Sequence, residues 1–184
     1  ARGGSYLNCQ IHSANSHINV ASDPFLGVFK SLRNAILRDA GTDNLNGNRL
    51  EESPLHNYFF LNEGSSNVDA VNKGSLLLDC PDPNWEELVE SMKPRVAHQC
   101  AELLPFLDRL RDKNYKDIID NSIDVIRQAR NLPDMKWIGI KEAWVIQLFL
   151  PLARAYPEAK FIVVVRDIRV SIASNILLKK KSLS

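Results

Sequence analysis

Apolar positions along the chain predict three short strands. Residues 161–165 (Phe-Ile-Val-Val-Val) are apolar throughout and mostly β-branched, as in a strand that is buried on both faces of a parallel sheet. Residues 18–21 and 137–141 predict two further strands, and the second of these ends in Lys141. A helical pattern follows 161–165 directly, so strand, helix, strand and helix alternate after residue 136. This alternation is typical of a parallel α/β sheet.

Apolar residues spaced three and four positions apart predict the helices. One helix is expected to begin at Asp23-Pro24, with Asp23 as its N-cap and Pro24 as its first residue. Its inward face would carry Phe25, Val28, Phe29, Leu32 and Ile36. Further helices are predicted over 83–112 with a break near Pro94, over 115–130, and over 144–155. Residues 41–84 are rich in Gly, Asn, Asp and Ser and predict long loops with short helical or strand insertions.

Size and charge narrow the class of protein. A chain of 184 residues suffices for one domain, and a net charge of +1 argues against a general binder of polyanions. Cys9, Cys80 and Cys100 lack metal-ligand spacing and are expected to be reduced and buried.

No apolar run is long enough to span a membrane, and a cytoplasmic location is expected, or the Golgi lumen if an anchor precedes the chain. The start at Ala1 without Met suggests a single domain that is incomplete at both ends.

Two segments have the residue types of phosphate sites. Arg166 follows the run 161–165, at the strand end where open α/β sheets bind ligands, and Ser174 lies eight residues further on, about two helical turns away. An arginine and a hydroxyl in this arrangement can clamp a phosphate, although a structural salt bridge at the turn is an equal alternative. Residues 2–6 (Arg-Gly-Gly-Ser-Tyr) provide small residues whose backbone N–H groups can surround a second phosphate.

Together these segments resemble the sulfotransferases that use 3′-phosphoadenosine 5′-phosphosulfate (PAPS), most closely the tyrosylprotein, bacterial and carbohydrate branch. The resemblance covers about residues 1–39 and 136–178. It implies a P-loop-like parallel sheet flanked by helices. The middle, 41–135, has no match in the family, and its helical and loop-rich pattern predicts an insertion that selects the acceptor. It also implies that Arg166 and Ser174 bind the 3′-phosphate of the donor. The residues implied for its 5′-phosphate side are Arg2, Gly3, Gly4, Ser5 and Tyr6.

The same resemblance implies two catalytic residues. Asp23 lies 21 residues after Arg2, at the position of the family's catalytic base, and Lys141 lies 25 residues before Arg166, where a lysine neutralises charge on the leaving group. The residue patterns leave alternatives open. Asp23 can be only a helix cap, Lys141 can form a surface pair with the adjacent Glu142, and a histidine, His12 or His17, can be the base.

The chain departs from the family pattern at four points. Tyr6 stands where the family's loop has a second threonine, and Asp23 replaces a glutamate. Ile168 stands where proline is frequent, and nothing matches the family's C-terminal donor-binding segment.

The expected function is transfer of a sulfuryl group from PAPS to a hydroxyl or amine, with release of 3′-phosphoadenosine 5′-phosphate (PAP). The acceptor would be a small molecule, carbohydrate, lipid or peptide. No metal, nucleic acid or membrane span is expected. The alternatives are a P-loop-type kinase or nucleotide hydrolase, against which the loop 2–6 lacks a lysine, and a non-catalytic module of the same fold that binds PAP or a protein partner.

Overall fold

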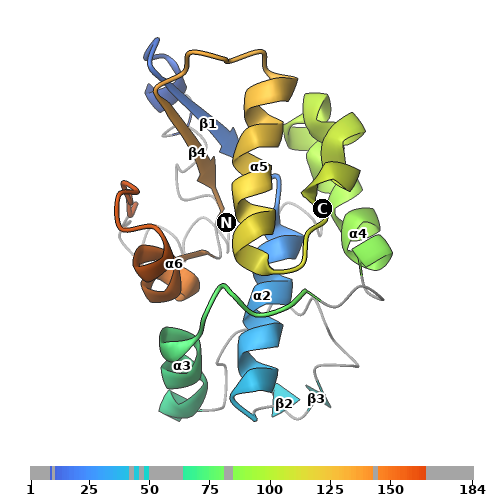
Figure 1. Cartoon of the computed structure of the whole chain (residues 1–184), viewed down its shortest axis with the longest axis vertical. Coiled ribbons are helices and arrows are strands. Elements are labelled where there is room, and N and C mark those ends of the chain that lie inside the picture. The colour runs from blue at the N-terminus through green and yellow to red at the C-terminus, as the bar shows by residue number, and fades with distance from the viewer. Residues whose placement is uncertain are drawn as a thin grey trace, which may run out of the picture.

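The computed structural model describes residues 9, 11–41, 44–45, 48–49, 64–80, 85–142 and 145–164. These residues form a mixed structure that is mostly helical and contains a small parallel sheet of two strands (Figure 1). The parallel strands are β1 (Ile18–Ser22) and β4 (Trp137–Lys141), and a short antiparallel pair is formed by β2 (Asn44–Leu45) and β3 (Asn48–Arg49). The α helices are α2 (Leu26–Asp39), α3 (Gly64–Lys73), α4 (Trp85–Gln99), α5 (Tyr115–Ala129) and α6 (Phe149–Ala155), and the 3-10 helices are η2 (Ala101–Leu110) and η3 (Val145–Leu148).

The parallel pair confirms two of the predicted strands. β1 and β4 align from Ile18 opposite Trp137 to Ser22 opposite Lys141. The arrows of β1 and β4 in Figure 1 therefore point the same way. Because parallel strands have their carboxyl ends at one edge, the residues that follow β1 and β4 lie next to each other.

Helix α2 runs through the middle of the structure, where it packs against α3, α4 and α5, and its buried side chains belong to the core (Figure 1). The apolar face predicted for it is buried, and Val28 and Leu32 are completely inaccessible. Its contact with α4 is so close that a Cβ on Gly27 would lie 2.9 Å from Met92 Cγ. Side chains from α4, η2 and α5 join the same cluster as those of α2, so residues 85–129 belong to this core.

Two predicted features of the helices are wrong. Helix α2 begins at Leu26, and Phe25 occupies the N-cap position without a side-chain cap, so Asp23 does not cap it. Helix α4 continues through Pro94 to Gln99, and the chain changes to η2 only after Cys100. A proline inside a helix removes one hydrogen bond. Here the buried side chains on both sides of it, including Leu88 and Val96, keep the two halves of α4 packed on the core.

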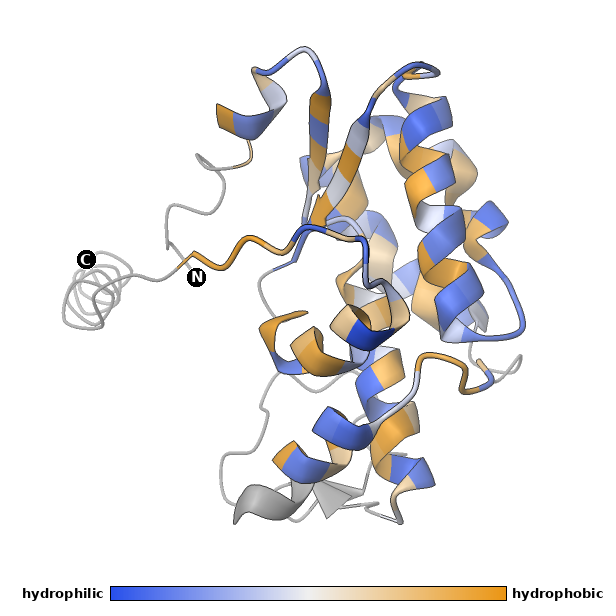
Figure 2. Ribbon diagram, turned by 60° about the vertical axis from the view of Figure 1, so that its left-hand side comes forward, coloured by the Kyte–Doolittle hydropathy of each residue, from blue (hydrophilic) through white to orange (hydrophobic). Residues whose placement is uncertain are grey.

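The strand predicted over 161–165 is absent where the structure describes it. Residues 161–164 are not in a strand, and their exposed fractions run from 40% for Phe161 to 63% for Ile162. Figure 2 shows this run as an orange stretch that leads away from the helices. Phe161 packs edge-on against Phe149, with 5.1 Å between the ring centroids. β1 and β4 pair only with each other in the described part of the chain, so no strand there receives the run.

No helix within the described residues is long and apolar enough to cross a membrane.

Candidate functional site

Asp23 and Lys141 meet at the carboxyl edge of the parallel pair. Lys141 is the last residue of β4, and Asp23 follows Ser22, the last residue of β1. The backbone N–H of Asp23 donates to the Lys141 carbonyl at 2.6 Å, and Lys141 Nζ contacts Asp23 Oδ2. The Asp23 side chain is 10% exposed and the Lys141 side chain is 18% exposed. The two residues, 118 positions apart in the sequence, therefore form a largely buried ion pair.

The backbone of Asp23 has an unusual conformation. Its φ angle of 55° lies in the left-handed region, which few residues other than glycine adopt and which costs free energy. Two contacts hold it there, the hydrogen bond to Lys141 and a bond of 3.1 Å from Arg95 Nε to the Asp23 carbonyl. The chain turns at this residue from β1 toward α2 and directs the carboxylate at Lys141.

Arg95 provides a second cation beside the Asp23 carboxylate. It lies on α4, and its NH2 group is 3.4 Å from Asp23 Oδ2. The side chain of Arg95 is 41% exposed, whereas that of Asp23 is almost buried. The carboxylate therefore lies between one buried cation from the sheet and one half-exposed cation from the middle region.

Glu142 adds a second carboxyl group to the cluster formed by Asp23, Lys141 and Arg95. Its Oε1 accepts the backbone N–H of Phe25 at 2.6 Å, and its Oε2 is inaccessible to water and has no hydrogen-bond partner among the described residues. Burial raises the pKa of Glu142 to about 8, the charge of Asp23 adds to the rise, and the Phe25 N–H, Arg95 and Lys141 oppose it. Lys141 and Glu142 are therefore not the surface pair considered above, since each has a different buried partner.

Two buried thiols lie near this cluster. Cys100 Sγ donates to the Ser22 carbonyl at 3.8 Å, and burial raises the pKa of Cys100. Burial also raises the pKa of Cys9, against a smaller effect of the Lys141 charge. Cys9, Cys80 and Cys100 form no disulfide bond. Thiols with raised pKa values are poor nucleophiles, which argues against a thiol mechanism at this site.

His17 directly precedes β1, at the end of the strand opposite Asp23. The carbonyl of His17 accepts the N–H of Trp137 at 3.0 Å, where the parallel pair begins. Strands rise about 3.3 Å per residue, so a strand of this length separates His17 from Asp23 by roughly 20 Å. His17 would therefore not act together with Lys141. His12 directly precedes Ser13, whose hydroxyl accepts the N–H of Val20 in the middle of β1 at 3.0 Å, so His12 stays an alternative base.

The predicted phosphate-binding residues lie outside the described part of the chain. These are Arg2, Gly3, Gly4, Ser5, Tyr6, Arg166 and Ser174. The structure thus brings together the two predicted catalytic residues and leaves the donor-binding residues as predictions.

Sequence reasoning missed Arg95 and Glu142 as members of the cluster. Glu142 had a usable signal, because it directly follows a predicted strand whose end was already of interest. Arg95 had none, since it is one of many charged residues on a helix and only the packing of α4 against α2 brings it to Asp23.

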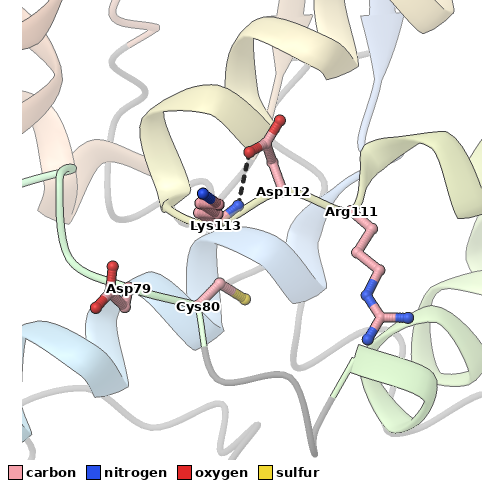
Figure 3. Close-up of a pocket in the computed structure, with 5 residues that line it drawn as sticks. All are labelled: Asp79, Cys80, Arg111, Asp112 and Lys113. Atoms are coloured by element: carbon pink, nitrogen blue, oxygen red, sulfur yellow. Dashed lines mark hydrogen bonds between the residues drawn. The ribbon is translucent and has the colours of Figure 1, made fainter.

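A separate pocket of about 490 Å³ is lined by Asp79, Cys80, Arg111, Asp112 and Lys113 (Figure 3). Asp79 and Arg111 lie on opposite sides of Cys80 in this view, and the Lys113 N–H donates to Asp112 at 2.6 Å. The lining includes none of the predicted catalytic or phosphate-binding residues, and its charges are mixed. It is therefore distinct from the Asp23 cluster.

The chain was compared with protein-family models, with curated proteins and with solved structures, and none of them matches it. Among the described residues, no group of three or more His, Cys, Asp or Glu side chains has an arrangement that could hold a metal ion. The case for a function therefore depends on the geometry of the cluster and on the sequence resemblance.

Proposed function

We propose that this chain is a sulfotransferase that moves a sulfuryl group from PAPS to a hydroxyl or amine and releases PAP. Asp23 is the base and Lys141 the group that stabilises the leaving phosphate. In this proposal β1 and β4 are neighbouring strands of a P-loop-like parallel sheet, and the donor lies at their carboxyl edge, as ligands do in open α/β sheets.

The contact between Asp23 and Lys141 is the observation that supports this proposal most. The two residues were selected by separate spacings, one counted from Arg2 and the other from Arg166. They are 118 positions apart, yet their side chains meet at one sheet edge. A family pattern that matched only by chance would not be expected to select two residues in contact.

The proposed reaction needs a base and a cation and no redox step. As the acceptor oxygen or nitrogen forms its bond to sulfur, Asp23 takes the acceptor proton. The bond between sulfur and the bridging oxygen breaks, its electron pair stays on the phosphate of PAP, and the Lys141 ammonium stabilises that charge. As in phosphoryl transfer, catalysis would depend mainly on alignment and on charge stabilisation.

The ion pair must open for this reaction to occur. In an in-line transfer the sulfur lies between the attacking and the leaving atom, so base and ammonium act on opposite sides of the transferred group. Donor binding would therefore move the Lys141 ammonium from Asp23 to the donor phosphate. Arg95 can stay beside Asp23 throughout, because it also bonds the Asp23 carbonyl, and so keeps the base oriented.

The donor phosphates would be held by the residues that the resemblance identifies. Arg166 and Ser174 would bind the 3′-phosphate, which distinguishes PAPS from ATP-like nucleotides, and residues 2–6 would bind the 5′ side. A guanidinium suits the 3′-phosphate because its fork of donors can bind two oxygens at once.

Calorimetry with PAP and with ATP plus Mg²⁺ tests the proposal. We expect PAP to bind in the absence of metal and more tightly than ATP. Arg166→Ala should weaken PAP binding about tenfold or more, on the scale of a charge-assisted bidentate contact, whereas Arg169→Ala makes the same charge change three residues further on and should have little effect. Preference for ATP with Mg²⁺ would favour a kinase or hydrolase, and binding of neither nucleotide would favour a non-catalytic module.

A further inference from the structure

Glu142 connects the end of β4 to the beginning of α2. It directly follows Lys141, and its Oε1 accepts the N–H of Phe25, the residue that precedes the first turn of α2. Phe25 itself is completely buried. This hydrogen bond substitutes for a side-chain cap, which α2 lacks, and it fixes the chain on the C-terminal side of Asp23.

The surroundings of Glu142 favour its neutral form. Its second oxygen, Oε2, is buried and has no hydrogen-bond partner in the described part of the chain, so an ionised carboxylate would leave a charge there without a donor. A protonated carboxyl group avoids this cost. The pKa of about 8, raised mainly by burial and then by Asp23, agrees with this geometry.

The charge state of Glu142 decides the net charge of the cluster. Asp23 carries one negative charge, and Lys141 and Arg95 each carry one positive charge, so the cluster has an excess of one positive charge while Glu142 is neutral. The other titratable groups whose charges interact with Glu142 are Lys30 on α2 and the Cys100 thiol before η2. Ionisation of Glu142 would add one negative charge, which would cancel the excess positive charge of Asp23, Lys141 and Arg95.

We propose that Glu142 is a positioning residue whose neutral carboxyl group anchors the start of α2 beside Asp23 and keeps the cluster positive toward an anionic donor. The inference rests on the proposed function for its ligand, the phosphate of PAP. Ionised, the same side chain would repel that phosphate at close range. Glu142 thus selects for a negatively charged ligand without touching it.

Binding of PAP between pH 7.5 and pH 9 tests this role. The phosphates of PAP are fully ionised over this range, since a phosphate monoester has its second pKa near 6. Burial raises the pKa of Cys9 and that of Cys100, which disfavours both thiolates over this range. We expect the affinity of the wild type for PAP to fall roughly tenfold across the range, as one added charge at close distance would cause. Glu142→Gln keeps an acceptor for the Phe25 N–H and should remain flat.

Each result decides between the two proposals. Equal loss of affinity in the wild type and in Glu142→Gln would overturn the role of Glu142 and leave the proposed function standing. If the wild type binds no PAP at any pH, the proposed function fails, and this inference fails with it. The Phe25 amide signal in NMR spectra of the free wild type is a second test that needs no variant. It should shift with a midpoint near pH 8, and a constant signal from pH 6 to pH 9.5 would also overturn the role of Glu142.

Discussion

Asp23 carries a buried negative charge that depends on partners from distant parts of the chain. Lys141 comes from the end of β4 and Arg95 from the middle of α4. Such a pair adds little net stability compared with apolar residues of the same size, because both charges lose their hydration. Removing one partner is costly, however, because the other charge stays buried. Loss of Lys141 should therefore destabilise the folded chain.

Replacing Lys141 tests whether this ion pair is buried as described. Lys141→Met should lower the free energy of unfolding by about 3 kcal/mol, the usual cost of leaving a buried charge without its partner. Lys116→Met is the matched control, because Lys116 pairs with Asp120 at 2.7 Å on the surface of α5, with 34% of its side chain exposed. The control should change stability by less than about 1 kcal/mol. Urea unfolding at pH 7 measures both, and equal small losses would contradict the burial of the pair.

At the scale of elements, the sequence predicted the helices and strands whose apolar pattern matches the way they pack in the structure. β1, β4 and α5 were predicted to within a residue or two, and the inward face of α2 was predicted correctly. The errors occur where local chemistry and packing differ. Asp23-Pro24 has the composition of a helix start. The Asp23 carboxylate instead contacts Lys141 and Arg95, and the helix begins at Leu26. Pro94 was expected to break a helix that tertiary packing keeps intact.

The run 161–164 is the element for which pattern and structure differ most. Its composition predicts a buried strand, whereas the described residues are exposed and unpaired. A substitution separates the two descriptions. Ile162 is 63% exposed, so Ile162→Lys should change the free energy of unfolding by no more than about 0.5 kcal/mol.

The control for this prediction is Ile118→Lys on α5, where the side chain is completely buried. That variant should lose several kcal/mol, or fail to fold, because it buries an unpaired charge. Thermal or urea unfolding compares the two. A loss at Ile162 as large as the loss at Ile118 would contradict the observed exposure and would support a buried third strand.

At the scale of the whole molecule, the candidate site brings together residues from three distant parts of the chain: Asp23 after β1, Arg95 on α4 and Lys141 at the end of β4. Asp23 and Lys141 could be predicted because the resemblance to the sulfotransferases implies them by spacing, 21 residues after Arg2 and 25 residues before Arg166. Arg95 could not, because its position depends on how α4 packs against α2, where Gly27 allows the two helices to come close. The middle region thus adds a charged group to the site and most of the helical core around it.

A crystal structure of the chain with PAP tests the central claim most directly. We expect Lys141 Nζ to lie within about 3 Å of an oxygen of the 5′-phosphate and to have left Asp23, while Arg95 still contacts the Asp23 carboxylate. The carboxylate would then face the open side of the phosphate, where an acceptor would bind. PAP bound away from the carboxyl edge of β1 and β4, or bound there with the Asp23–Lys141 pair still closed, would contradict the account.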